Sequence, residues 1–143
     1  MPGSHRSLRF EQVRVGDELP ALPIPLTTSL IVAGAVASQD YTPVHHDREA
    51  ARAAGMQDVF MNILTTNGLV SRFVTDWAGP DARVDRLAVK LGTPNLPGDT
   101  MTLTGAVSEV DAGTSRVTVR VTGKNSWGNH VTGSVRVVLP KGA

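Results

Sequence analysis

The hydrophobic pattern of the chain changes its period once, at Gly79-Pro80, and this change limits the folds open to it. Across residues 62–78 the apolar side chains recur at helical spacing, and Gly79-Pro80 ends the run. Because these positions cover most of the circumference, we expect a long helix that is buried among other elements. Beyond it, apolar and polar residues alternate as in half-buried antiparallel strands, at 87–91, 101–103, 117–121 and 131–139.

A helix-rich half followed by strands predicts an α+β domain in which an antiparallel sheet curls around one long helix. We expect the domain to span residues 8–140 and residues 1–7 to form a flexible tail. Three prolines within residues 20–25 predict an edge strand or an extended strap. Ser29 and Asp47 are the expected N-caps of short helices at 30–38 and 48–54, with a strand as the alternative for 30–38.

Composition excludes several classes of function. The chain of 143 residues has no cysteine, which excludes disulfides, thiolate metal sites and a cysteine nucleophile and is compatible with a reducing compartment. A formal net charge of +1 without a basic run argues against nucleic acid as a partner. The longest apolar run, 30–37, is too short to cross a bilayer, and the N-terminus lacks the apolar region of a signal peptide. We therefore expect a cytoplasmic protein with no membrane or nucleic-acid partner.

Residues 38–47 place two carboxylates and two imidazoles around one proline. Pro43 fixes its own φ and favours an extended Thr42, so Asp40 and His45 lie on a segment that cannot continue a helix. An Asp–His pair facing one cleft can bind a water molecule and exchange protons with it. A purely structural turn, in which Asp40 ends a helix and His45 binds a carbonyl, explains the same spacing. The residues alone leave both interpretations open.

The same segment contains side chains of the types that bind zinc: Asp40, His45, His46 and Asp47. Adjacent histidines usually diverge, and the sequence lacks a third convincing element such as a helical His-Glu pair. We therefore expect no metal site. His130 follows a turn on a predicted strand, and we expect it to be structural.

Asn62 immediately precedes the long helix and can act as its N-cap. The unpaired backbone N–H groups behind it, at Ile63 and Leu64, form a natural site for an anion or an oxyanion. A capped helix without any such role is the simpler interpretation.

The chain also carries a known signature. Ser38-Gln39-Asp40-Tyr41-Thr42-Pro43-Val44-His45-His46-Asp47, followed by Ala50-Ala51 and Gly55-Met56, resembles that of the MaoC-like, (R)-specific enoyl-CoA hydratases. The resemblance implies a hotdog fold, with a long central helix wrapped by a curved antiparallel sheet. It implies that Asp40 and His45 are catalytic, activating the water that adds to an enoyl thioester. It also implies that Asn62 and Ile63 at the start of the helix bind the substrate, with the Ile63 N–H as the donor to the thioester carbonyl. Coenzyme A then enters only as part of the substrate, with no cofactor.

The signature is changed at three places. The family's glycine before the catalytic aspartate is Gln39 here, its asparagine is Thr42, and its His-Gly-Met at the start of the helix is Asn62-Ile63-Leu64. The catalytic pair is kept, whereas the end that binds the carbonyl is altered.

Longer runs are similar to the small MaoC-like subunits of actinobacterial steroid side-chain hydratases. They are Val44-His45-His46-Asp47-Arg48, Asn62-Ile63-Leu64-Thr65, Gly68-Leu69-Val70 and Val74-Thr75-Asp76-Trp77-Ala78-Gly79-Pro80. This similarity implies a steroid side-chain enoyl-CoA as the substrate, in steroid or cholesterol degradation. It also implies a heteromeric complex with a second, MaoC-like/DUF35-type subunit, and a thiolase-like aldolase as a further partner.

Two other functions remain open from the sequence. The chain could be a non-catalytic hotdog subunit that completes the acyl-CoA pocket of a partner. It could also be an acyl-CoA thioesterase, although such enzymes usually carry a carboxylate on the long helix, where this chain has only Asp76 near the end.

Overall fold

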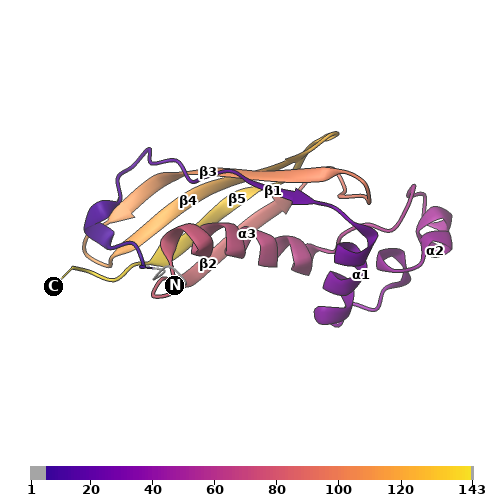
Figure 1. Ribbon diagram of the computed structural model, residues 1–143, viewed down its shortest axis with the longest axis horizontal. Helices are drawn as coiled ribbons and strands as arrows, with labels where there is room; N and C mark the ends of the chain where they lie inside the picture. The colour runs from indigo at the N-terminus through magenta and orange to yellow at the C-terminus, as the bar shows by residue number, and fades with distance from the viewer. Residues whose placement is uncertain (1–5, 143) are drawn as a thin grey trace, which may run out of the picture.

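The structure, a computed structural model, describes residues 6–142. Its helices are α1 (Thr28–Ala37), α2 (Arg48–Ala53) and α3 (Ile63–Ala78), with short 3-10 helices η1 (Phe10–Gln12) and η2 (Pro43–His45). Its strands are β1 (Leu22–Pro25), β2 (Arg83–Leu91), β3 (Thr100–Asp111), β4 (Arg116–Asn125) and β5 (Gly128–Val138). They form one antiparallel sheet in the order β1-β3-β4-β5-β2. Helix α3 lies along one face of this sheet, and α1 and α2 gather at one end (Figure 1).

The alternating segments predicted from the sequence lie in strands, except that β5 ends at Val138, one residue before the predicted end. Strands β4 and β5 form a hairpin that pairs from Arg116↔Val138 to Asn125↔Gly128. Val117, Val119 and Val121 alternate into the same buried cluster as α3, which is the reason for the period of two. The prediction of an α+β domain with four alternating strands after the long helix is confirmed.

Strand β1 lies at one edge of the sheet and pairs only with β3. Just beyond β1, the Leu26 N–H donates to the Asp99 carbonyl at 2.8 Å. Since the direction of the N–H groups alternates along a strand, the even-numbered residues of β1 point their N–H groups toward β3. Pro23 and Pro25, which have no N–H, therefore face the open edge, where proline is tolerated. Of the two alternatives predicted for 20–25, the edge strand is confirmed for residues 22–25.

Helix α3 buries one side against the sheet through Val70, Phe73 and Val74. Burial of each such side chain contributes roughly 1.5–3 kcal/mol. Its first turn is different, because Ile63 and Leu64 are 46% and 50% exposed. The prediction that the helix is buried on most sides is therefore wrong for the chain by itself. No helix of residues 6–142, α3 included, is long and apolar enough to cross a membrane.

The caps of the two shorter helices were predicted with mixed success. Asp47 caps α2 by accepting hydrogen bonds from the N–H groups of Glu49 and Ala50, as predicted. Helix α1 starts earlier than predicted, because the extended residue Thr27 caps it by accepting from the Leu30 N–H at 3.0 Å. The prediction of Ser29 as the cap is wrong by two residues, since both hydroxyls can cap and the chain uses the first.

Most of the predicted tail, residues 1–5, lies outside the described residues. Ser7, at its end, contacts the turn after α3: its Oγ accepts a hydrogen bond from the Asp81 N–H at 2.6 Å. Gly79 makes this approach possible, because a Cβ there would lie 2.9 Å from Ser7 Oγ and Gly79 has a φ of 93°. Ser7 is thus anchored to the far end of α3.

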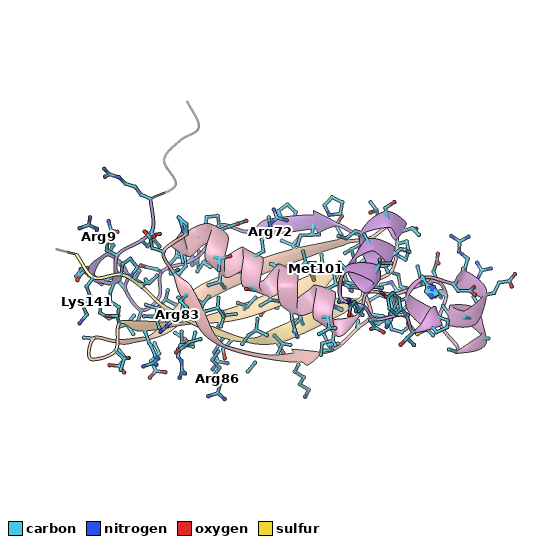
Figure 2. The ribbon with its side chains drawn as sticks, turned by 90° about the horizontal axis from the view of Figure 1, so that it is seen from below. Arg9, Arg72, Arg83, Arg86, Met101 and Lys141 are labelled. Atoms are coloured by element: carbon cyan, nitrogen blue, oxygen red, sulfur yellow. The ribbon has the colours of Figure 1, made fainter. Side chains whose placement is uncertain are left out.

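A bulge between Val84 and Arg86 turns Asp85 of β2 toward two arginines. Its carboxylate accepts hydrogen bonds from Arg136 Nε at 2.8 Å and Arg116 Nε at 2.7 Å. These bonds, that of Arg136 first, lower the pKa of Asp85 from 3.8 to about 2. Asp85 thereby links β2 to β4 and β5. Figure 2 shows Arg83 and Arg86 of β2 at the same end of the molecule as Arg9 and Lys141.

We expect Asp85→Asn to remove a pH-dependent part of the stability. Because the pKa in the folded state lies below the ordinary value, the stabilisation is complete above about pH 3.8 and is lost as the pH falls toward about 2. Urea unfolding of the wild type should therefore weaken more steeply across this window than that of the variant. Asp81→Asn, at an exposed turn nearby, is the control, and parallel pH curves for the wild type and Asp85→Asn would contradict the prediction.

Candidate active site

Asp40 is placed by the way α1 ends. The helix closes in a Schellman motif, in which the Gln39 N–H donates to the Val36 carbonyl at 3.0 Å and the Asp40 N–H to the Ala35 carbonyl at 2.9 Å. This motif needs a left-handed residue, and Gln39 has a φ of 57°. Glycine adopts that φ without strain, which explains the glycine at this position in the family signature. The end of α1 thus fixes the backbone that carries Asp40.

His45 ends η2, and its imidazole is buried with only 8% of the residue exposed. Its Nδ1 lies 2.7 Å from the Phe60 carbonyl oxygen, which can only accept, so Nδ1 carries the hydrogen. In the neutral ring Nε2 then keeps its lone pair. Nε2 lies 3.4 Å from Asp40 Oδ2, and the Phe60 ring packs edge-on against the imidazole at 4.7 Å. The two residues singled out in the sequence therefore meet.

Asn62 connects this pair to α3. Its Nδ2 donates to Asp40 Oδ2 at 3.1 Å and to Ser38 Oγ at 2.9 Å. Its Oδ1 accepts from the Thr65 N–H at 3.0 Å, which caps the helix as predicted. The residue is 2% exposed, so water does not compete for these hydrogen bonds. One buried amide therefore serves both the helix and the carboxylate.

Asp40 is held as a carboxylate by its neighbours. The hydrogen bond from Asn62 is the largest influence, and with those from Thr42 it lowers the pKa of Asp40. Thr42 Oγ1 donates to Asp40 Oδ1 at 2.8 Å, and the Thr42 N–H lies 3.3 Å from the same oxygen. The charge that His45 carries when protonated lowers the pKa of Asp40 further, but less. Asp40 is therefore an ionised acceptor at neutral pH.

The start of α3 supplies N–H groups beside the carboxylate. The first N–H groups of a helix have no acceptor within it, and Asn62 Oδ1 caps only that of Thr65. The groups of Ile63 and Leu64, at the first two helical positions, are left for an external acceptor at the positive end of the helix dipole. The predicted oxyanion donor, Ile63, thus directly follows the residue that binds Asp40.

The approach of α1 to α3 depends on one glycine. A Cβ at Gly34 would lie 2.8 Å from Cγ2 of Thr65 and still nearer to its Oγ1. Thr65 cannot simply turn away, because its hydroxyl donates to Asn62 Oδ1. Gly34 therefore sets the short spacing at which Ser38 and Asp40 reach Asn62.

Beside Ser38, the two helices form an open apolar hollow of about 320 Å³. It is lined by small and aliphatic residues, namely Gly34, Ala37, Ser38, Leu64, Thr65, Gly68 and Leu69. A larger hollow of about 1170 Å³ is lined by residues near the two ends of the chain, which carry charges of both signs. Figure 1 shows these ends of the chain at the opposite end of the molecule from α1. Only the smaller hollow adjoins the Asp40 site.

Sequence reasoning missed three groups at this site: Ser38, the Thr42 hydroxyl and the Phe60 carbonyl. Thr42 had a local signal, because Asp-x-Thr is a spacing at which a carboxylate accepts from the second residue on. Ser38 lies 24 residues from Asn62 along the chain, and a backbone carbonyl such as that of Phe60 has no signal in the sequence.

The possible metal ligands do not form a cluster. Within the part of the chain that the structure describes, no three carboxylate or imidazole side chains converge as ligands. His46 is exposed, and its Nε2 lies 3.4 Å from the Tyr41 carbonyl oxygen. The adjacent imidazoles therefore diverge.

The sequence of the chain is similar to those of known proteins. The sequence model of the family described as MaoC like domain matches residues 10–129. The 3-oxo-4,17-pregnadiene-20-carboxyl-CoA hydratase beta subunit of Mycobacterium tuberculosis is 46% identical over 125 residues, which cover 87% of this chain and 95% of that protein.

Solved structures agree with the sequence comparison. A chain in the ChsH1-ChsH2 complex from Mycobacterium tuberculosis matches with a TM-score of 0.86 at 44% identity, covering 88% of this chain and 98% of that one. The unliganded R-hydratase PhaJ1 from Pseudomonas aeruginosa also has a TM-score of 0.86, over 95% of this chain and 88% of its own, but at 19% identity. The second likeness shows the fold alone, and together they confirm the predicted hotdog fold.

We expect Gly34→Ala to lower the free energy of unfolding by about 1–3 kcal/mol, because the new Cβ forces α1 and Thr65 apart. Gly68→Ala is the matched control, since a Cβ at this helical position meets nothing within 4 Å. That variant should be more stable than the wild type by about 0.5–1 kcal/mol. Urea unfolding measures both, and an equal stabilisation of the two variants would contradict the proposed close contact.

Proposed function

This chain belongs to the MaoC-like domain family, and from that premise we propose that it is a subunit of an enoyl-CoA hydratase. The reaction adds water across the double bond of a 2-enoyl-CoA thioester. The observation that carries the proposal is the Asp40–His45 pair, held at 3.4 Å and joined by Asn62 to the start of α3.

Asp40 Oδ2 and His45 Nε2 are two acceptors that face each other, so both can bind one water molecule. Asp40 is ionised. With Nδ1 of His45 bound to the Phe60 carbonyl, the lone pair of the neutral ring lies at Nε2, which can take a proton from that water. The oxygen then bonds to C3 of the enoyl group. The proton taken by the pair is returned to C2, so that one water molecule is consumed and the residues regain their initial state.

The negative charge that develops on the thioester oxygen during this addition needs a donor. In our proposal the Ile63 N–H supplies it, because it lies at the positive end of α3 directly after Asn62. Asn62 itself orients Asp40 instead of contacting the substrate carbonyl. No metal or cofactor takes part in the proposed steps, and coenzyme A enters with the substrate.

We propose a steroid side-chain enoyl-CoA as the substrate, in steroid degradation. The support is the name of the 46% identical relative, a 3-oxo-4,17-pregnadiene-20-carboxyl-CoA hydratase beta subunit. The apolar hollow between α1 and α3, together with exposed Leu64 and Val36, offers a wide surface for a large acyl group.

We further propose that the chain works in a heteromeric complex, as the similar chain in the ChsH1-ChsH2 complex does. A second MaoC-like/DUF35-type subunit would cover the exposed first turn of α3, and a thiolase-like aldolase is proposed as a further partner. A cytoplasmic location is part of the same proposal, in keeping with a chain that has no cysteine.

No specific observation favours a thioesterase. The only carboxylate on α3 is Asp76, which is 60% exposed and paired with Arg72 at 3.3 Å near the far end of the helix. The intact pair at Asp40 and His45 also argues against a purely supporting subunit.

Asp40→Asn and His45→Ala should each lower kcat for hydration by about 10²- to 10⁴-fold. The first replaces one charged acceptor oxygen by a donor, and the second removes the acceptor Nε2. The assay follows loss of the ultraviolet absorbance of the conjugated enoyl thioester, with the assembled complex. Asp47→Asn is the matched control, since it makes the same charge change seven residues away and asparagine still caps α2. Full turnover by Asp40→Asn would show that the chain only completes a partner's pocket.

The substrate proposal can be tested with two thioesters, 3-oxo-4,17-pregnadiene-20-carboxyl-CoA and crotonyl-CoA, each with the chain alone and with its candidate second subunit. We expect kcat/KM to be at least about 10-fold higher for the steroid thioester, because a bulky apolar group contributes binding in the hollow. Equal rates would refute the steroid preference. Release of free coenzyme A without hydration would favour the thioesterase instead.

A further inference from the structure

A buried histidine, His130, occupies a break in the ladder between β4 and β5. The pairing passes from Gly123↔Val131 to Lys124↔Asn129, which leaves His130 without a partner. His130 and Val131 are consecutive and only 2% and 1% exposed. In a regular strand consecutive side chains point to opposite faces, so the bulge is what turns both inward. The bulge thus places the imidazole of His130 in the core.

The imidazole of His130 is hydrogen-bonded at both nitrogens. Nδ1 lies 2.7 Å from the Thr93 carbonyl oxygen and therefore carries the hydrogen. Burial lowers the pKa of His130, which keeps the ring neutral and makes Nε2 an acceptor. The Thr66 hydroxyl, at 2.8 Å and fully buried, is then the donor to Nε2.

Thr66 lies one turn into α3, directly behind the site. Its N–H donates to the Asn62 carbonyl at 3.2 Å, so Thr66 and Asn62 move together. The loop after β2, whose Thr93 binds His130, also binds the residue before Asn62. The Asn95 carbonyl of this loop accepts a hydrogen bond from the Met61 N–H at 3.1 Å. The first turn of α3 is therefore tied to the loop after β2 on two sides.

That loop is itself rigidly held. Asn125 Nδ2 donates to the Pro94 carbonyl at 2.9 Å and to Asn95 Oδ1 at 3.0 Å. The Thr93 N–H donates to the Asn129 carbonyl at 2.9 Å, beside the bulge. His130 consequently connects a fixed part of the sheet to the helix turn that carries Asn62 and Ile63.

We propose that His130 is a positioning residue of this site: through Thr66 it fixes the first turn of α3, and with it the Asn62 amide and the Ile63 N–H. The inference rests on the proposed hydratase function. His130 does not contact Asp40 or His45, so it acts only through the geometry of α3.

A polar contact suits this task better than an apolar one. Packed aliphatic side chains tolerate small rotations or shifts of a helix. The short buried hydrogen bond between Thr66 and His130 is instead lost when the helix shifts, which leaves two costly unpaired groups. Asn62 needs such accuracy, because its single Nδ2 must reach both Ser38 and Asp40.

The test is Thr66→Val, which keeps the shape of the side chain and removes the donor to His130. In the assembled enzyme, well below its melting temperature, we expect kcat for hydration to fall by about 10- to 100-fold with KM unchanged. Thr66→Ser, which restores the hydroxyl, should recover most of kcat. Thr75→Val, at a half-buried position in the last turn of α3 and far from Asn62, is the matched control and should leave kcat unchanged.

His130 is tested separately by two amides. His130→Asn keeps a donor near the place of Nδ1 but loses the acceptor for Thr66, so it should resemble Thr66→Val. His130→Gln keeps an acceptor near the place of Nε2 and should retain more activity. The double variant Thr66→Val/His130→Asn should be no slower than either single one, because both break the same link.

The possible outcomes separate the two proposals. Wild-type kcat in Thr66→Val and His130→Asn, with only a lowered melting temperature, would overturn the inference and leave the hydratase function standing. Absence of hydration by the wild-type complex would overturn the hydratase proposal and this inference with it. A fall in kcat with shifted amide resonances of Asn62 and Ile63 would support the positioning role.

Discussion

The amide of Asn62 is the group on which the rest of the site depends. Its oxygen caps α3, and its nitrogen donates hydrogen bonds to Asp40 and Ser38. One planar group thus joins the start of α3 to the loop that follows α1. The orientation of the amide is set by this requirement, because only the nitrogen can donate to a carboxylate. A change in the helix start is therefore transmitted directly to the carboxylate.

This arrangement also explains why the helix start can differ from the family signature. An asparagine in place of the usual histidine supplies both the cap and a donor to Asp40, and Thr42 in place of asparagine supplies a second donor. Gln39 accepts the left-handed conformation that a glycine would adopt more easily. Both changed positions, Thr42 and Asn62, therefore donate hydrogen bonds to the Asp40 carboxylate.

Much of the fold could be predicted because it follows from periodicity, which is local. The strands were located by alternation, but the start of β2 was missed, since the bulge at Asp85 interrupts the pattern at Val84 and Arg86. The site was predicted where its groups lie close in sequence, as Asp40 and His45 do. The supports of the site could not be predicted: Thr66 and His130 are 64 residues apart, and a bulge that turns an imidazole inward has no signature in one sequence.

The two edges of the sheet differ in what they can bind. Along β1 the outward positions are Pro23 and Pro25, which have no hydrogen to donate, whereas β2 presents ordinary backbone groups from Arg86 to Leu91. A strand from another molecule would therefore meet no donor at the outward positions of β1, whereas the backbone of β2 offers both donors and acceptors. The two prolines thus make strand addition unfavourable along β1 and leave β2 as the edge open to another sheet.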